Sequence, residues 1–125
     1  FGKFAPEAEG GEITVTPAGV RSSKGTVVLS SGEFRSATFR LYGEPEAVVS
    51  VILPQTTTHL INTVTGKEMT VEKWTTCEMV NETKSTVLTN GTVILNIGTT
   101  LMVGTIEDNP VGLYSGKYEI TFTYN

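Results

Sequence analysis

Side chains able to act as nucleophiles or bases are few in this sequence and stand far apart. His59 is the only histidine and Cys77 the only cysteine, which rules out a histidine-cluster metal site and an internal disulfide. The Gly-x-Ser-x-Gly turn that holds the nucleophile of many hydrolases is also absent from the sequence. We expect His59 to be a solvated loop residue and Cys77 to be an ordinary half-buried thiol, with an intermolecular disulfide as the alternative.

Acidic residues are candidates for the paired carboxylates of a glycosidase or for the oxygen ligands of a calcium ion. They lie in a Gly-rich segment, 7–12, and in a polar turn, 107–109, where solvated side chains are the commoner outcome. The spacing in 107–109 matches no established calcium-binding loop. Gly10-Gly11 leads into a strand, so this pair lacks the helix N-terminus that receives a phosphate. The sequence therefore predicts no enzyme, no metal and no cofactor.

Two aromatic residues, Tyr42 and Trp74, are the candidates for binding a ligand, because together they would form a platform on which a sugar ring stacks. Packing in the core or at its rim is the alternative for each of them. Glycosylation sequons begin at Asn81 and Asn90, but such matches arise easily in a threonine-rich chain. Asn90-Gly91 is better explained as a two-residue hairpin turn, since both residues accept positive φ.

The elements that position these residues are strands, as the composition indicates. The chain of 125 residues contains 21 threonines and 13 glycines, and only 18% of its residues are charged. β-Branched side chains suit a pleated sheet and are poor helix formers. We therefore expect an all-β fold, and this length corresponds to a single domain spanning residues 1–125.

Charge and hydropathy exclude two classes of partner. The net charge is −4 and the nine basic residues are scattered singly, so no basic stripe is available for a phosphate backbone. No run approaches the roughly 18 apolar residues that span a bilayer. We expect neither nucleic-acid binding nor membrane insertion. The chain begins at Phe1, as it would after removal of a secretory leader or at a chosen boundary.

Turn residues punctuate the sequence about every 8–12 residues, which is the spacing of a β-sandwich. The nearly continuous apolar run at 48–53 predicts a strand that is covered on both faces. Segment 56–62 is open between a strand and a loop, and 74–85 is predicted to be a polar connection. We expect an immunoglobulin-like β-sandwich of about seven to nine short antiparallel strands. Further strands are predicted at 12–16, 26–30, 35–42, 67–74, 92–97, 99–103 and 116–125. The predicted core comprises Phe34, Phe39, Leu41, Val51, Leu53, Leu95 and Ile97.

The last of these strands is the most informative, because its two faces differ. Its apolar face comprises Tyr118, Ile120, Phe122 and Tyr124. A strand with such a face needs a neighbour, either from the same fold or from another chain. A complete sandwich would supply this neighbour from residues 1–16 or 99–106. An incomplete, strand-lacking sandwich would instead leave the terminal strand as an acceptor edge, and the sequence leaves both alternatives open.

Short motifs follow one another in order along nearly the whole chain. They are Phe1-Gly2, Gly10-Gly11, Pro17-Ala18-Gly19 with Arg21, Ala37–Pro45, Ser50–Pro54, Met69–Val71, Val103-Gly104, and the ending Gly112–Gly116 through Tyr124-Asn125. Together they resemble a family of bacterial exported domains known as DUF4402. Each motif is weak alone, and the specificity lies in their order and in the Gly-x-Tyr-Ser-Gly ending.

That family is similar in turn to spore-coat-U-type and other chaperone–usher pilus subunits, which are immunoglobulin-like sandwiches without their final strand. The resemblance implies that a periplasmic chaperone, and then the N-terminal extension of the next subunit, supplies the missing strand. Tyr124 matches the penultimate tyrosine of such subunits. Relatives carry an alternating apolar segment before the Phe-Gly pair, whereas this sequence starts at Phe1. We expect that the segment was removed, was cleaved or never existed.

We therefore expect a structural subunit of a bacterial surface filament, assembled by donor-strand complementation, with Tyr118 to Tyr124 as the subunit contact. Its partners would be neighbouring copies or a related subunit, and a periplasmic chaperone. It would be exported, passing through the periplasm to the cell surface or the medium. The alternative is a monomeric secreted binding module that recognises glycan or protein through loops 54–66 and 74–86.

Overall fold

The computed structural model of the chain describes residues 1–54, 57–76 and 85–124. This described part consists of strands, turns and loops without a helix, so the all-β prediction is confirmed. Its strands are β1 (Phe4–Ala5), β2 (Gly11–Val15), β3 (Arg21–Gly25), β4 (Val28–Leu29), β5 (Ala37–Tyr42), β6 (Val48–Ile52), β7 (Thr58–Asn62), β8 (Glu68–Thr76), β9 (Ser85–Val87), β10 (Thr92–Val103), β11 (Tyr114–Ser115) and β12 (Thr121–Tyr124). All of their pairings are antiparallel.

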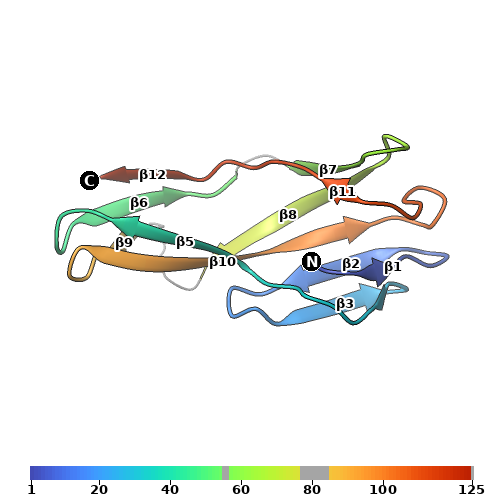
Figure 1. Cartoon of the computed structure of the whole chain (residues 1–125), viewed down its shortest axis with the longest axis horizontal. Coiled ribbons are helices and arrows are strands. Elements are labelled where there is room, and N and C mark those ends of the chain that lie inside the picture. Colours follow the sequence, from blue (N-terminus) through green and yellow to red (C-terminus); the bar gives the residue numbers. More distant parts are fainter. Residues whose placement is uncertain (55–56, 77–84, 125) are drawn as a thin grey trace.

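The largest sheet is organised around β10, the longest strand (Figure 1). One edge of β10 pairs with β8, while the other edge pairs with β5 over residues 92–97 and with β2 over residues 99–103. Strands β7 and β11 continue the sheet beyond β8, and β3 continues it beyond β2. Gly98 lies where the partner changes from β5 to β2, and a Cβ at this position would overlap the carbonyl oxygen of Val15.

A second layer covers one face of this sheet. It consists of the three-stranded sheet β12–β6–β9 and the short β1–β4 pair. The core between the layers has two clusters. One comprises Val51, Leu53, Leu95 and Ile97. The other, which Phe4 of β1 and Leu29 of β4 help to cover, comprises Ile13, Val27, Met69, Val71, Leu101 and Val103. Two layers packed over a shared core confirm the predicted β-sandwich.

Strand β3 falls where the sequence predicts a turn. Residues Arg21–Gly25 form a hairpin with β2, and only Val28 and Leu29 of the predicted 26–30 strand remain in a ladder. The prediction was wrong here because β3 is an edge strand whose side chains are mostly exposed. An exposed edge strand needs no apolar alternation, which is the signal that the prediction uses.

Strand β6 differs from its prediction in burial. Val49 and Val51 are buried, but Val48 and Ile52 are 41% and 46% exposed. The strand is therefore covered on one face, and the prediction of cover on both faces was wrong. The physical reason is that β6 belongs to an outer layer of a two-layer sandwich, and no further layer packs on it within the described part of the chain.

The predicted core is confirmed except at Phe34. The four buried residues of the first cluster are all among those predicted, and Phe39 and Leu41 pack against them while remaining partly exposed. Phe34 is 39% exposed and lies at the surface, where the Arg21 guanidinium stacks 4.3 Å from the centre of its ring. Phe34 precedes β5, and its ring packs against the Arg21 guanidinium on the surface rather than against the core.

Three local predictions have distinct outcomes. Asn90 and Gly91 have φ of 56° and 84°, which confirms the hairpin turn. Segment 56–62, open between strand and loop, contains strand β7. Most of the predicted 74–85 connection, including Cys77 and the sequon at Asn81, lies outside the described residues.

Candidate functional site

The terminal strand lies at the edge of the second layer (Figure 1). Strand β12 pairs with β6 and has no other partner among the described strands. Residues 1–16 and 99–106, which a complete sandwich would place beside it, pair elsewhere or not at all. Residues 116–120 were expected to belong to the same strand, but they are extended without joining a ladder.

Two of the four predicted contact residues are already packed inside this chain. Ile120 and Phe122 lie against the core cluster around Val51, and the ring centres of Phe122 and Phe39 are 6.1 Å apart. Their apolar surface is therefore covered largely by the chain itself. What β12 leaves unpaired is its outer backbone edge, not these two side chains.

A third contact residue, Tyr124, closes the sandwich at the end of β12. Its Oη lies 3.4 Å from the carbonyl oxygen of Tyr42 and contacts Gly43. A Cβ at position 43 would overlap the Tyr124 hydroxyl, so this close approach requires glycine. Together with the Phe39–Phe122 contact, it joins β5 to β12 across the two layers.

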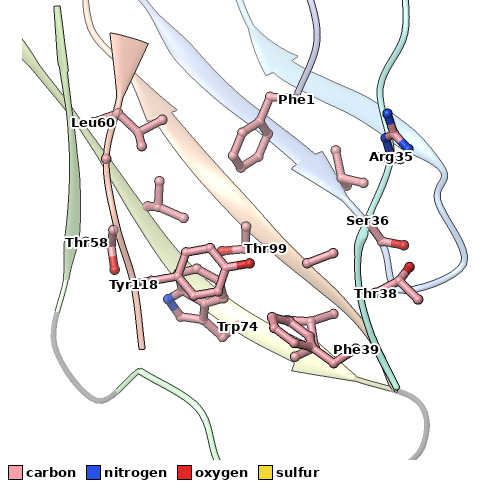
Figure 2. Close-up of a pocket in the computed structure, with 15 residues that line it drawn as sticks. Phe1, Arg35, Ser36, Thr38, Phe39, Thr58, Leu60, Trp74, Thr99 and Tyr118 are labelled. Atoms are coloured by element: carbon pink, nitrogen blue, oxygen red, sulfur yellow. The ribbon is translucent and has the colours of Figure 1, made fainter. Parts of the chain in front are cut away.

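Beyond this closed end lies an open cavity of about 570 Å³, which we call the slot (Figure 2). One wall consists of residues 35–39, and the other includes Gly116 and Tyr118, the fourth predicted contact residue. Phe1 and Leu60 lie at the end of the slot away from Phe39. Its floor is the large sheet, through Val15, Val71, Trp74, Ile97 and Thr99.

Part of each wall of the slot presents unpaired backbone, although residues 37–39 of the first wall pair with β10. Residues 33–36 and 116–120 contain no turn or bend, and neither segment joins a ladder with any described strand. The N–H and C=O groups of an extended, unpaired segment are available to another strand. A mostly apolar floor between two such segments therefore has the features of a site for one additional β-strand.

An aromatic pair lies in the slot. The ring centres of Trp74 and Tyr118 are 4.7 Å apart with an interplanar angle of 45°. Trp74 Nε1 is buried and has no hydrogen-bond partner among the described residues. Tyr42, in contrast, is 71% exposed on the outward side of β5. The structure thus places Trp74 in the slot and Tyr42 outside it, and does not bring the two together as one platform.

The residues weighed for catalysis do not come together in one site within the described part of the chain. His59 is exposed on β7, not in a loop as predicted, and its Nδ1 lies 3.4 Å from Glu68 Oε2. In the 107–109 turn, Asn109 uses its Oδ1 to accept the backbone N–H of Gly104 at 2.6 Å. Among the described residues, no group of three His, Cys, Asp or Glu side chains could hold a metal ion.

Arg21 is the residue of this region whose role sequence reasoning missed. Its Nη1 donates to the carbonyl oxygens of Phe1 and Lys3 at 3.0 and 3.1 Å, and its Nη2 donates to that of Ser30 at 2.6 Å. Because the guanidinium also stacks on Phe34, Arg21 connects residues 1–3, at the end of the slot, to the segment that leads into the slot wall. Burial, and secondarily the Arg21 charge, lowers the pKa of the Phe1 α-amino group. The only feature of the sequence that marked Arg21 was its place after the Pro17-Ala18-Gly19 turn.

The family model described as "Domain of unknown function (DUF4402)" matches residues 1–124. The chain belongs to the DUF4402 family. The matched region includes every residue that lines the slot of this DUF4402 domain. No curated protein and no solved structure matches the chain. The described residues of the DUF4402 domain include no helix with the length and apolar character that a membrane crossing requires.

Proposed function

We propose that this DUF4402 domain is a structural subunit of a bacterial surface filament, assembled by donor-strand complementation. The observation that carries the proposal is the slot, a mostly apolar cavity between two extended segments, 33–36 and 116–120, that pair with no described strand. A strand from a neighbouring copy or a related subunit would lie beside 116–120. It would add one strand to the second layer of the sandwich.

The slot favours a strand with alternating apolar residues. Side chains on one face of such a strand would meet Val71, Trp74 and Ile97 on the floor. Each apolar side chain that is fully buried contributes about 1.5–3 kcal/mol. Three of them contribute roughly 5–9 kcal/mol before the cost of ordering the strand, in addition to the backbone ladder. This gain supports a lasting contact between subunits.

An open slot would also call for a partner during export. Unpaired edges beside an apolar floor pair readily with other chains and cause aggregation. The proposal therefore includes a periplasmic chaperone that occupies the slot in transit, and the cell surface as the destination. Tyr118, on the slot wall, would be the predicted contact residue that meets the donor directly.

A second candidate is a monomeric secreted binding module for glycan or protein. The Trp74–Tyr118 pair supports it, because the pair lies in a cavity of about 570 Å³. Small-molecule sites commonly occupy roughly 300–1,000 Å³ and are lined by aromatic side chains. The two candidates differ in what fills the slot, which is a strand in the first and a ligand in the second.

A fused donor strand tests the filament proposal. A short segment of alternating threonine and valine, joined by a flexible linker to Phe1, which lies at the end of the slot away from Phe39, can enter the slot from that open end. We expect Tm to rise by roughly 5–15 °C and the fluorescence of Trp74, the only tryptophan, to change. The matched control carries the same residues with the valines in one block. Equal Tm values for the two fusions would refute the slot as a strand site.

Filling the slot from within is a second test. Ala37→Phe adds a ring to the slot wall, and Arg40→Phe adds the same ring on the outward side of β5. We expect Ala37→Phe to abolish filaments formed by the chain as its complete gene encodes it, and Arg40→Phe to leave them. Electron microscopy and size-exclusion chromatography provide the readout. A stable monomer that loses glycan-array binding on Trp74→Ala would support the second candidate instead.

A further inference from the structure

A second cavity adjoins the slot on the side toward one end of the molecule. This cavity, the side groove, measures about 510 Å³ and lies between residues 1–6 and residues 109–114. It shares Phe1 and Leu60 with the slot. The chain from 109 to 118 therefore runs along one wall of both cavities, which adjoin at Phe1 and Leu60.

The outer ends of these two adjoining cavities differ. At the β12 end, the contact of Phe39 with Phe122 closes the space between the layers. At the other end, the side groove opens beside Ile106 and Val111, which line it. A strand that fills the slot must connect to the rest of its own chain, and the open end is where the side groove allows it to leave.

The open end carries an exposed apolar surface, which we call the pole. Its side chains, Ile106, Val111 and Leu113, all line the side groove and are 49%, 87% and 72% exposed. The loop between β10 and β11, to which they belong, lies at the end of the molecule opposite the C-terminus (Figure 1). Three exposed aliphatic side chains along one cavity give the pole an apolar surface suited to cover by another protein.

Buried hydrogen bonds hold the pole in place. Asn62 is 1% exposed, and its Oδ1 accepts the N–H groups of Val64 and Thr65 at 2.9 and 3.0 Å. Asn109 is 3% exposed, and its Nδ2 donates to the carbonyl oxygen of Glu68 at 2.8 Å. Asn62 thus fixes the 62–66 turn, and Asn109 fixes the loop that lines one side of the side groove, so little ordering of that loop is needed when a partner binds.

We propose that the pole docks the folded body of a second copy of this chain, the copy whose strand fills the slot. The inference rests on the proposed function and adds a second contact to it. The donor strand leaves through the side groove beside Val111, so the domain attached to it is held against the pole. The position of the side groove directly beside the slot, with Phe1 and Leu60 lining both, is the observation that favours a second copy over an unrelated partner.

A charge at the pole tests this inference. Val111→Glu places a carboxylate among the aliphatic side chains of the pole. Val20→Glu is the matched control, because Val20 is 60% exposed in the turn between β2 and β3 and lines neither cavity. Analytical ultracentrifugation of the chain as its complete gene encodes it measures self-association. Trp74 fluorescence reports occupancy of the slot, and thermal unfolding checks that both variants fold.

We expect Val111→Glu to weaken self-association by about tenfold or more, and Val20→Glu to change it by less than about twofold. If Val111→Glu fails to fold, Val111→Thr, which is close to valine in size, replaces it with an expected loss of about threefold. Equal association of the pole variant and its control, with Trp74 still responding to assembly, would overturn the pole and leave strand donation intact. If the unmodified chain shows no self-association and no Trp74 fluorescence response, both the pole and strand donation are overturned.

Discussion

Asn62→Ala is expected to lower the free energy of unfolding by about 2–4 kcal/mol. The Asn62 Oδ1 accepts two backbone N–H groups, from Val64 at 2.9 Å and from Thr65 at 3.0 Å. Alanine removes the acceptor, and each part-buried donor left without a partner costs about 1–2 kcal/mol, the lower half of the usual range, because water reaches this turn. The Nδ2 contacts to the carbonyl oxygens of Pro110 and Val111 are 3.5 Å long and add little.

Urea unfolding and calorimetry measure this change directly. A loss of about 3 kcal/mol lowers Tm by roughly 10 °C in a domain of this size. Asn96→Ala is the control, because Asn96 Oδ1 accepts a single exposed hydrogen bond from the Thr38 hydroxyl at 3.0 Å. We expect this control to lose less than about 1 kcal/mol. Unfolding midpoints that coincide for the two variants would refute the role of Asn62 in holding the turn at residues 62–66.

Three further predictions concern the closed end and the N-terminus. Gly43→Ala should cost about 1 kcal/mol, since its Cβ meets the hydroxyl of the exposed Tyr124 side chain, which can shift, and Cδ1 of the buried Leu88. Urea unfolding should show a smaller loss in a Tyr124→Phe background, and strictly additive losses would contradict the contact. Arg21→Lys should cost about 1–2 kcal/mol, because lysine lacks the planar fork that stacks on Phe34, and an unchanged Tm would argue against this. In a chain whose first residue is Phe1, the lowered pKa of the α-amino group means that the unfolded state binds more protons. Stability should therefore rise as pH increases toward 8.0, and an N-acetylated chain with the same pH dependence would contradict the assignment.

Local patterns predicted much of the fold. The abundance of threonine and β-branched residues indicated an all-β chain, and the structure has strands throughout its described part. Asn90-Gly91 predicted a turn with positive φ, which is found. Val51 and Leu95 were expected in the core and are 1% and 0% exposed. Each of these predictions depends on a few residues that are neighbours in the sequence, so it does not require knowledge of the tertiary contacts.

Predictions that depended on distant neighbours were less complete. Alternation places Tyr118, Ile120 and Phe122 on one face of the terminal segment. It does not reveal that Phe122 packs on Phe39 while Tyr118 lines an open cavity. Likewise, β3 was missed because its only support is a ladder with β2, and Arg21 carried no sign of the three carbonyl groups that it binds.

The sequence by itself determined the fold class, the family resemblance, the positions of most strands and the apolar face of the terminal segment. Residue type, a period of two and turn chemistry act locally, so they can be recognised without coordinates. Only the tertiary structure decided that segments 33–36 and 116–120 border the slot, and that the side groove adjoins it and reaches the pole. Which backbone edges stay unpaired, and how closely two layers approach, depend on contacts between residues far apart in the chain.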